Sequence, residues 1–139
     1  MNAIINPGTV VGCVEAPPSK SYAHRLMICA ALAEGKSTVS GISDSQDMQA
    51  TIDCIRALGA ECDFDGNSIT IQGDLNRYSD NTVFPCRESG STLRFFMPIA
   101  LATGEKTAVF TGTERLIQRG IGVYEKLFSE KGIVLEKGK

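Results

Sequence analysis

The sequence of 139 residues predicts a mixed α/β fold in which one unit of strands and helices occurs twice. The first observation is an internal repeat, since "RLMICAALAEGKSTVSG" (25–41) matches "RFFMPIALATGEKTAVFTG" (94–112). The second is that each copy continues into another helical run that ends in glycine, at "CIRALGAEC" (54–62) and "KLFSEKGIVL" (126–135). Two copies of one unit favour a repeat fold over a chance mixture of elements.

The first unit, about residues 9–73, is predicted to contain a strand, a buried helix, a second strand, an amphipathic helix and a hairpin. We expect strands at 9–15 and 37–42 from their β-rich composition, and a helix over 20–33. The helix over 45–58 carries apolar residues at helical spacing, with Ser43 and Gln46 as a capping box and Gly59 as its end. The stretch 61–71 alternates around Asp65-Gly66-Asn67, which is typical of a hairpin.

The second unit, about residues 82–139, is predicted to repeat this order after a polar loop at 74–81. A strand is expected at 82–86, a helix at 89–102 and a strand at 106–111. Pro98 falls inside that helix, where it removes a backbone donor, frees the carbonyl of Arg94 and predicts a kink. A buried helix that tolerates one proline is an equally good interpretation.

The composition is that of an ordinary globular domain, with 42% apolar and 22% charged residues. The net charge of −2 gives no general attraction for nucleic acid, so any anion site must be local. No stretch approaches the roughly 18 apolar residues of a membrane span, and the N-terminus lacks the features of a signal peptide.

Five cysteines without C-x-x-C spacing favour reduced thiols and a cytoplasmic protein. Cys29 and Cys54 fall in apolar runs and are expected to be small core residues. No His, Cys or Asp cluster has the spacing of a metal site, and no nucleotide-binding glycine motif occurs. We therefore predict no metal and no organic cofactor.

Charged and hydroxyl residues crowd the start of the first helix, in "PPSKSYAHR" (17–25). The helix that follows is apolar on every side, so we expect it to be buried. Lys20, Ser21 and Arg25 at its positive dipole end would repel that end unless an anion lies in front of it. The second helix repeats the arrangement in "ESGSTLRF" (88–95), where Gly90 would let a ligand approach the backbone.

The alternative is purely structural: Ser19 and Ser89 cap the helices, and the basic residues pair with internal carboxylates. The only histidine, His24, is more often a hydrogen-bonded packing residue than a catalyst. In "GTERLIQRGIG" (112–122), Arg115 and Arg119 predict either an exposed helix start or another clamp for carboxylate or phosphate.

The three stretches "PPSKSYAHR", "ESGSTLRF" and "GTERLIQRGIG" resemble successive motifs of the 3-phosphoshikimate 1-carboxyvinyltransferase (EPSP synthase) family. The resemblance covers essentially the whole chain. It implies repeated βαβαββ units with buried parallel helices, and transfer of the enolpyruvyl group of phosphoenolpyruvate to shikimate 3-phosphate without a cofactor. A related transferase acting on a UDP-sugar is set aside, because it would carry Lys-Asn at the helix start and a cysteine before the clamp arginine.

The resemblance also implies roles for individual residues. Lys20 would contact phosphoenolpyruvate and lie near both substrates, while Ser21 and Arg25 would hold shikimate 3-phosphate. Gly90 and Ser91 would line the phosphoenolpyruvate site, and Arg119 would grip that ligand. Each role suits anionic substrates that must be held in contact.

Two residues depart from the pattern: many members have Asn where Glu88 stands and Pro where Gly120 stands. The chain is also much shorter than full members of the family. We therefore expect an amino-terminal fragment, a partial transferase domain that does not turn over alone and has no assigned catalytic residue. It should expose apolar surface and therefore either self-associate or be only marginally stable. The alternative is a non-catalytic module that binds an anion or a partner.

Overall fold

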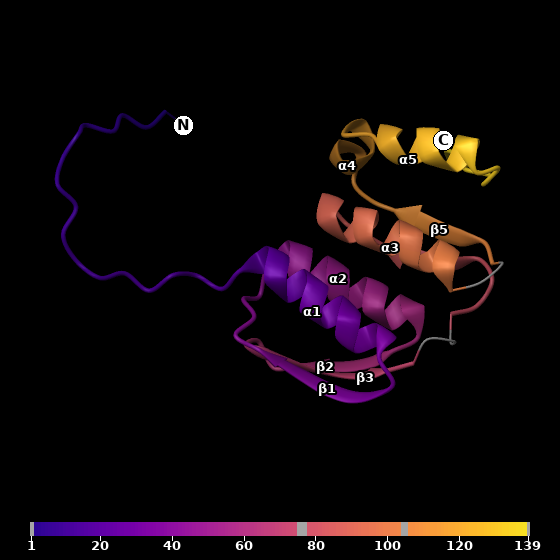
Figure 1. Cartoon of the computed structure of the whole chain (residues 1–139), viewed down its shortest axis with the longest axis horizontal. Helices are drawn as coiled ribbons and strands as arrows, with labels where there is room; N and C mark the ends of the chain where they lie inside the picture. The colour runs from indigo at the N-terminus through magenta and orange to yellow at the C-terminus, as the bar shows by residue number, and fades with distance from the viewer. Residues whose placement is uncertain (1, 75–77, 104–105, 139) are drawn as a thin grey trace.

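The computed structural model of the chain describes residues 2–74, 78–103 and 106–138. It has a mixed helix-and-strand architecture, which confirms the predicted α/β class. In Figure 1 a three-stranded sheet lies at one side, the first two helices cover it, and a third helix lies on these. A smaller parallel sheet and two short helices follow at the opposite side. The division into two units stays a prediction.

The three-stranded sheet is antiparallel throughout, with the order β1-β3-β2. Its strands are β1 (Gly35–Ser40), β2 (Glu61–Phe64) and β3 (Ser68–Gly73). At the end of β3, a Cβ on Gly73 would overlap the carbonyl oxygen of Ala33. Glycine is required there because the end of the first helix lies directly against the strand.

The hairpin between β2 and β3 is confirmed around Asp65-Gly66-Asn67. Asp65 Oδ1 accepts the backbone N–H groups of Asn67 and Ser68 at 2.8 and 2.6 Å. These two hydrogen bonds favour the ionised carboxylate and lower the pKa of Asp65. Gly66 supplies the positive φ of +99° that the turn needs.

The two first helices of the repeat are present as α1 (Lys20–Leu32) and α3 (Gly90–Ala102). Ser19 and Ser89 are their N-caps and accept the N–H groups of Tyr22 and Thr92. The capping half of the structural alternative is therefore confirmed.

The expectation that α1 and α3 are buried on every side is wrong. One face of helix α1 packs on the three-stranded sheet and on the helix over residues 46–58. The opposite face leaves Tyr22, Leu26 and Cys29 exposed. Cys29 is thus not a core residue, whereas Cys54 is buried as expected. Helix α3 likewise leaves Leu101 exposed. An apolar sequence makes burial favourable but does not itself supply the element that covers it.

The second helix of the first unit is α2 (Gln46–Leu58). Its N-cap is Ser45, whose side chain accepts the N–H of Met48, so the predicted capping box at Ser43 is wrong by two residues. The predicted end is confirmed, because Gly59 adopts a left-handed φ of +106°.

The predicted second unit begins with β4 (Thr82–Pro85). This strand pairs in parallel with β5 (Ala108–Thr111), and α3 lies between the two strands in the sequence. Phe84 of β4 is fully buried and packs against the rings of Tyr78, Phe96 and Phe110. The chain then forms α4 (Glu114–Gln118) and α5 (Gly122–Glu130). Of the predicted loop at 74–81, residues 75–77 lie outside the described part of the chain.

The predicted strand at 9–15 is wrong. Residues 2–18 form no helix or strand, are exposed throughout and extend away from the folded part (Figure 1). A β-strand is stabilised by hydrogen bonds to a neighbouring strand, and this segment has no such partner among the described residues. Its β-rich composition is therefore not sufficient to form a strand.

Candidate functional site

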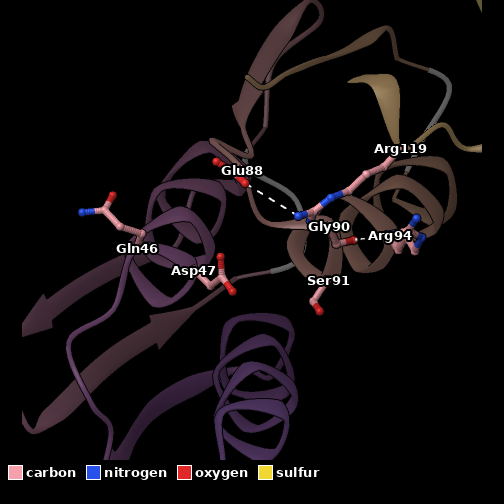
Figure 2. A pocket seen from close by; sticks show the side chains of 7 residues that line it. All are labelled: Gln46, Asp47, Glu88, Gly90, Ser91, Arg94 and Arg119. Carbon is pink, nitrogen blue, oxygen red and sulfur yellow. Dashed lines mark hydrogen bonds and ion pairs between the residues drawn. The ribbon is translucent and has the colours of Figure 1, made fainter. Parts of the chain in front are cut away.

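A polar cavity of about 420 Å³ lies where the starts of α2 and α3 approach the end of α4. Figure 2 shows its lining side chains, which come from three separate parts of the sequence. They are Gln46, Asp47, Glu88, Gly90, Ser91, Arg94 and Arg119. Gly90, Ser91 and Arg119 were candidate site residues from the sequence, and the structure brings these three together.

Lys20, Ser21 and Arg25 do not line this cavity. Lys20 reaches its edge, because its ammonium pairs with the carboxylate of Asp47. Arg25 donates from Nη1 to the carbonyl oxygen of Ser21 at 2.8 Å, and its guanidinium lies 5.2 Å from the centre of the Phe95 ring. The Arg25 side chain therefore lies between α1 and α3.

Arg119 owes its position to the way in which α4 ends. It is the C-cap of α4, and the next residue, Gly120, has a left-handed φ of +66° that reverses the chain. Proline cannot adopt this conformation, because its ring fixes φ near −65°. Gly120 thus permits a turn after Arg119 that a proline at this position could not form.

Both arginines of the third motif meet the same carboxylate. Glu88 Oε1 lies 3.2 Å from Arg115 Nη1 and 3.6 Å from Arg119 Nη2 (Figure 2 draws the latter contact). The cavity therefore holds cations and carboxylates side by side.

Of the basic residues at the two helix starts, only Lys20 pairs with a carboxylate, that of Asp47, as the structural alternative expected. Arg25 and Arg94 donate to backbone carbonyl groups instead, so this half of the alternative is confirmed for Lys20 alone.

A chain of buried hydrogen bonds lies behind the cavity and joins the starts of α1 and α3 to the middle of α2. His24 Nδ1 lies 2.6 Å from Thr51 Oγ1, which lies 2.8 Å from Thr92 Oγ1. Thr92 Oγ1 in turn donates to Ser89 Oγ at 2.7 Å. All four residues are at most 2% exposed, so this polar chain is part of the core.

Each threonine hydroxyl has one hydrogen, and this determines which group is the donor in each of these hydrogen bonds. Thr92 gives its one hydroxyl hydrogen to Ser89, so Thr51 must donate to Thr92. Thr51 then has none left for His24, and Nδ1 of His24 must be the donor. His24 is a hydrogen-bonded packing residue, as the sequence favoured.

Burial also sets the charge of His24. Removal from water disfavours the imidazolium and lowers the pKa of His24, and the positive charges of Lys20 and Arg25 act in the same direction. The carboxylate of Asp47 opposes this shift but does not reverse it.

Sequence reasoning did not select Gln46 and Asp47 as site residues. Asp47 sits in the first turn of α2, where a carboxylate is expected to interact with the helix dipole. The sequence could have indicated Asp47, because it lies in the first turn of a helix with a serine N-cap, as do the candidate residues at the starts of α1 and α3. Arg94 was noted in the second motif but not assigned, and it donates to the carbonyl of Gly90 at 3.1 Å.

Among residues 2–74, 78–103 and 106–138, no group of three or more His, Cys, Asp or Glu side chains could hold a metal ion. None of the helices described for the chain is long and apolar enough to cross a membrane.

The fold and the site define an α/β protein with a polar cavity at converging helix ends, lined by arginine, hydroxyl and carboxylate groups. The chain belongs to the EPSP synthase (3-phosphoshikimate 1-carboxyvinyltransferase) family, whose model matches residues 4–137. This confirms the resemblance predicted from the three motifs.

Individual relatives agree with this assignment. The chain is 39% identical to a 3-phosphoshikimate 1-carboxyvinyltransferase of Clostridium kluyveri, over 97% of this chain and 32% of the relative. It is 40% identical to one of Clostridium perfringens, over 94% of this chain and 31% of the relative. The solved EPSP synthase of Acinetobacter baumannii superposes with a TM-score of 0.75 at 23% identity, over 92% of this chain and 29% of that one, which shows the common fold. The chain thus spans about a third of the length of its curated relatives.

Proposed function

We propose that this chain supplies part of the substrate site for transfer of the enolpyruvyl group from phosphoenolpyruvate to shikimate 3-phosphate. The family assignment supports the reaction. The observation that carries the site is that Gly90, Ser91 and Arg119, from two separate motifs, line one cavity. A guanidinium and a helix start are suited to a phosphate or carboxylate group.

In this proposal Arg119 binds phosphoenolpyruvate, and Gly90 and Ser91 contact it at the start of α3. Lys20 reaches the same ligand from the other side once its ammonium leaves Asp47. Ser21 and Arg25 hold shikimate 3-phosphate, which requires Arg25 to turn away from Phe95. Since both substrates are multiply anionic, the cations offset their mutual repulsion as well as hold them in contact.

The chain by itself is proposed to bind its ligands weakly and not to turn over. It spans about a third of the length of its relatives, and the resemblance places the acid and base carboxylates of the reaction in the remaining part of the family's length. General acid–base catalysis needs those groups within hydrogen-bond reach of the transferred proton. The free cysteines of the structure support the proposal of a cytoplasmic location.

The site can be tested by titrating the ¹⁵N-labelled chain with phosphoenolpyruvate and following amide shifts. We expect shifts centred on Gly90, Ser91 and Gly120, with a Kd on the order of 1 mM. Arg119→Ala should weaken binding about ten- to a hundredfold, because a hydrogen bond between charged groups contributes about 1.5–3 kcal/mol. Lys126→Ala is the matched control, since its exposed ammonium pairs only loosely with Glu130 at 4.0 Å and does not line the cavity.

Shifts that spread elsewhere, or equal binding by the two variants, would contradict the proposed site. A turnover assay with both substrates tests the second part of the proposal, and any rate above buffer would refute it. Tight, stand-alone binding of shikimate 3-phosphate without turnover would instead favour a non-catalytic binding module.

A further inference from the structure

Glu88 occupies the centre of the interactions at the cavity, although its charge opposes the binding of an anion. One of its carboxylate oxygens, Oε1, contacts both Arg115 and Arg119, at 3.2 and 3.6 Å. Arg119 also lines the cavity and is the side chain that would grip an anionic ligand. The carboxylate of Glu88 therefore stands where a ligand carboxylate or phosphate would make its contacts.

The backbone around Glu88 is fixed on both sides. Arg87 has a positive φ of +52°, a conformation that is uncommon for a residue with a side chain. Its guanidinium binds Asp53 on α2 at 2.6 and 2.9 Å. Its carbonyl oxygen accepts the N–H of Thr113, just before α4, at 2.7 Å.

A backbone conformation of this kind persists when the surrounding contacts determine it. The preceding residue adds one more contact, because the N–H of Cys86 donates to the carbonyl of Thr111 at 2.8 Å. Glu88 is thus presented toward α4 by a loop that is tied to both α2 and the segment before α4. Its side chain, in contrast, is 42% exposed and free to move away from the arginines.

We propose that Glu88 is an internal competitor for the anion-binding arginines of this site. Its carboxylate neutralises Arg115 and Arg119 while the site is empty and must leave them when an anionic ligand binds. The inference rests on the proposed function, because it assumes that Arg119 binds the ligand. The ligand chemistry is that of a phosphate or carboxylate group, which makes the same contacts to a guanidinium as Glu88.

Two effects set the size of this competition. The ion pairs of Glu88 with the two arginines are half-exposed. Breaking each of them therefore lowers the affinity for an anionic ligand by only a few-fold at most. A ligand anion that enters the cavity is also repelled by Glu88 and by Asp47, while Arg94 and Lys20 offset part of this repulsion. Removing the Glu88 charge should therefore increase affinity about three- to tenfold.

The decisive variant is Glu88→Gln, which keeps the size of the side chain and removes its charge. Inorganic phosphate is the probe, titrated into the ¹⁵N-labelled 139-residue chain while amide shifts are followed. Glu114→Gln is the matched control, because Glu114 opens α4 and pairs with Gln118 at 3.2 Å but does not line the cavity. It removes the same charge from a neighbouring position. Urea unfolding of all three proteins checks that each is folded.

We expect Glu88→Gln to bind phosphate about three- to tenfold more tightly than the unchanged chain, and Glu114→Gln to bind within about twofold of it. If the unchanged chain binds phosphate and Glu88→Gln binds it equally or more weakly, the competition is refuted while the anion site stands. If none of the proteins binds phosphate or phosphoenolpyruvate, the proposed site fails and this inference falls with it.

A second measurement needs no ligand. The guanidinium N–H signals of Arg115 and Arg119 report whether each group is held in place, since Glu88 contacts Nη1 of the first and Nη2 of the second. In Glu88→Gln we expect both to show faster exchange with water than in the unchanged chain, whereas Arg87, bound to Asp53, should not change. Unchanged exchange at Arg115 and Arg119 would show that Glu88 does not hold them in solution, and would overturn the proposal.

Discussion

The single histidine of the chain, His24, lies buried where α1 meets α2, and its Nδ1 is the first donor of the hydrogen bonds that end at Ser89. Burial favours the neutral imidazole, while the donor count keeps a hydrogen on Nδ1. The neutral charge and the hydrogen bond donated by Nδ1 both indicate that His24 supports the packing behind the cavity. The charge of His24 therefore affects folding stability more directly than ligand binding.

This argument predicts a loss of stability in mild acid. Because burial lowers the folded-state pKa of His24, the unfolded chain binds a proton near pH 6.5 that the folded chain does not. The stability that the neutral His24 contributes to the folded chain is fully present above pH 6.5 and is lost as the pH falls below this value. Between pH 7 and 5.5 the free energy of unfolding should drop by at most about 1.3 kcal/mol.

Urea unfolding of the chain and of His24→Gln at both pH values measures this effect. The glutamine amide can still donate to Thr51 but does not titrate, so its stability should be nearly constant over this range. A parallel decline in the two proteins would show that another group is responsible.

At the residue scale, the sequence identified Gly90, Ser91 and Arg119, which the structure brings to one cavity, because helix starts and paired arginines follow local rules. The positions of the Lys20 and Arg25 side chains could not be predicted in the same way. They depend on Asp47 and on the ring of Phe95, which the fold brings close from other helices. Glu88 was noted from the sequence, but only the structure shows that it contacts both arginines of a distant motif.

At the scale of elements, one hydrogen bond joins α5 to α3 near the cavity. Pro98 has no N–H, so the carbonyl of Arg94 lacks its partner within the helix. The hydroxyl of Tyr124 on α5 donates to this carbonyl at 2.8 Å. A group that the proline leaves unpaired is thus used to dock a neighbouring helix.

Tyr124→Phe should lower the free energy of unfolding by about 0.5–1.5 kcal/mol, because it leaves the Arg94 carbonyl without a donor. In a Pro98→Ala background the same change should cost less, since residue 98 then supplies an N–H to that carbonyl. Urea unfolding of the four proteins forms a double-mutant cycle. Tyr22→Phe is the control, because Tyr22 is 65% exposed on α1. Equal costs of Tyr124→Phe in both backgrounds would refute the link between Pro98 and Tyr124.

The helices and strands illustrate what local sequence determines. The end of α2 at Gly59 and the hairpin at Asp65-Gly66-Asn67 were predicted because glycine and Asx turns act within a few residues. The strand expected at 9–15 did not form, because a strand needs a partner that local sequence does not specify. The hydrogen bond from Tyr124 to Arg94 could not be predicted either, although the free carbonyl was.

At the scale of the whole molecule, large apolar side chains are exposed on the helices, on the parallel sheet and in the N-terminal segment. On the sheet and the C-terminal helices they are Val83, Val109, Ile117, Val123 and Leu127. Helices α1 and α3 leave Tyr22, Leu26 and Leu101 accessible. The N-terminal segment, residues 2–18, exposes valines and isoleucines at 90% or more; they are Ile4, Ile5, Val10, Val11 and Val14. Isolated apolar residues on a surface are ordinary, but a continuous run of extended chain with this composition favours association. The predicted self-association is therefore assigned in the first instance to this segment.

Deleting residues 1–16 separates association from folding. Residues 2–16 are all exposed, and Ser19, the N-cap of α1, is retained. The free energy of unfolding should therefore change by no more than about 0.5 kcal/mol. Sedimentation velocity should show the unchanged chain associating as its concentration rises, and the shortened chain associating less.

The matched comparison is Leu26→Lys in the unchanged chain, which alters the exposed face of α1 and leaves the segment intact. If association persists in the shortened chain but falls in Leu26→Lys, the helix face is the contact. A loss of more than about 1 kcal/mol on deletion would mean that residues 1–16 pack on the folded part in solution. A clean monomer at all concentrations for the unchanged chain would refute self-association itself, since the exposed apolar residues would then be too dispersed to bring two copies together.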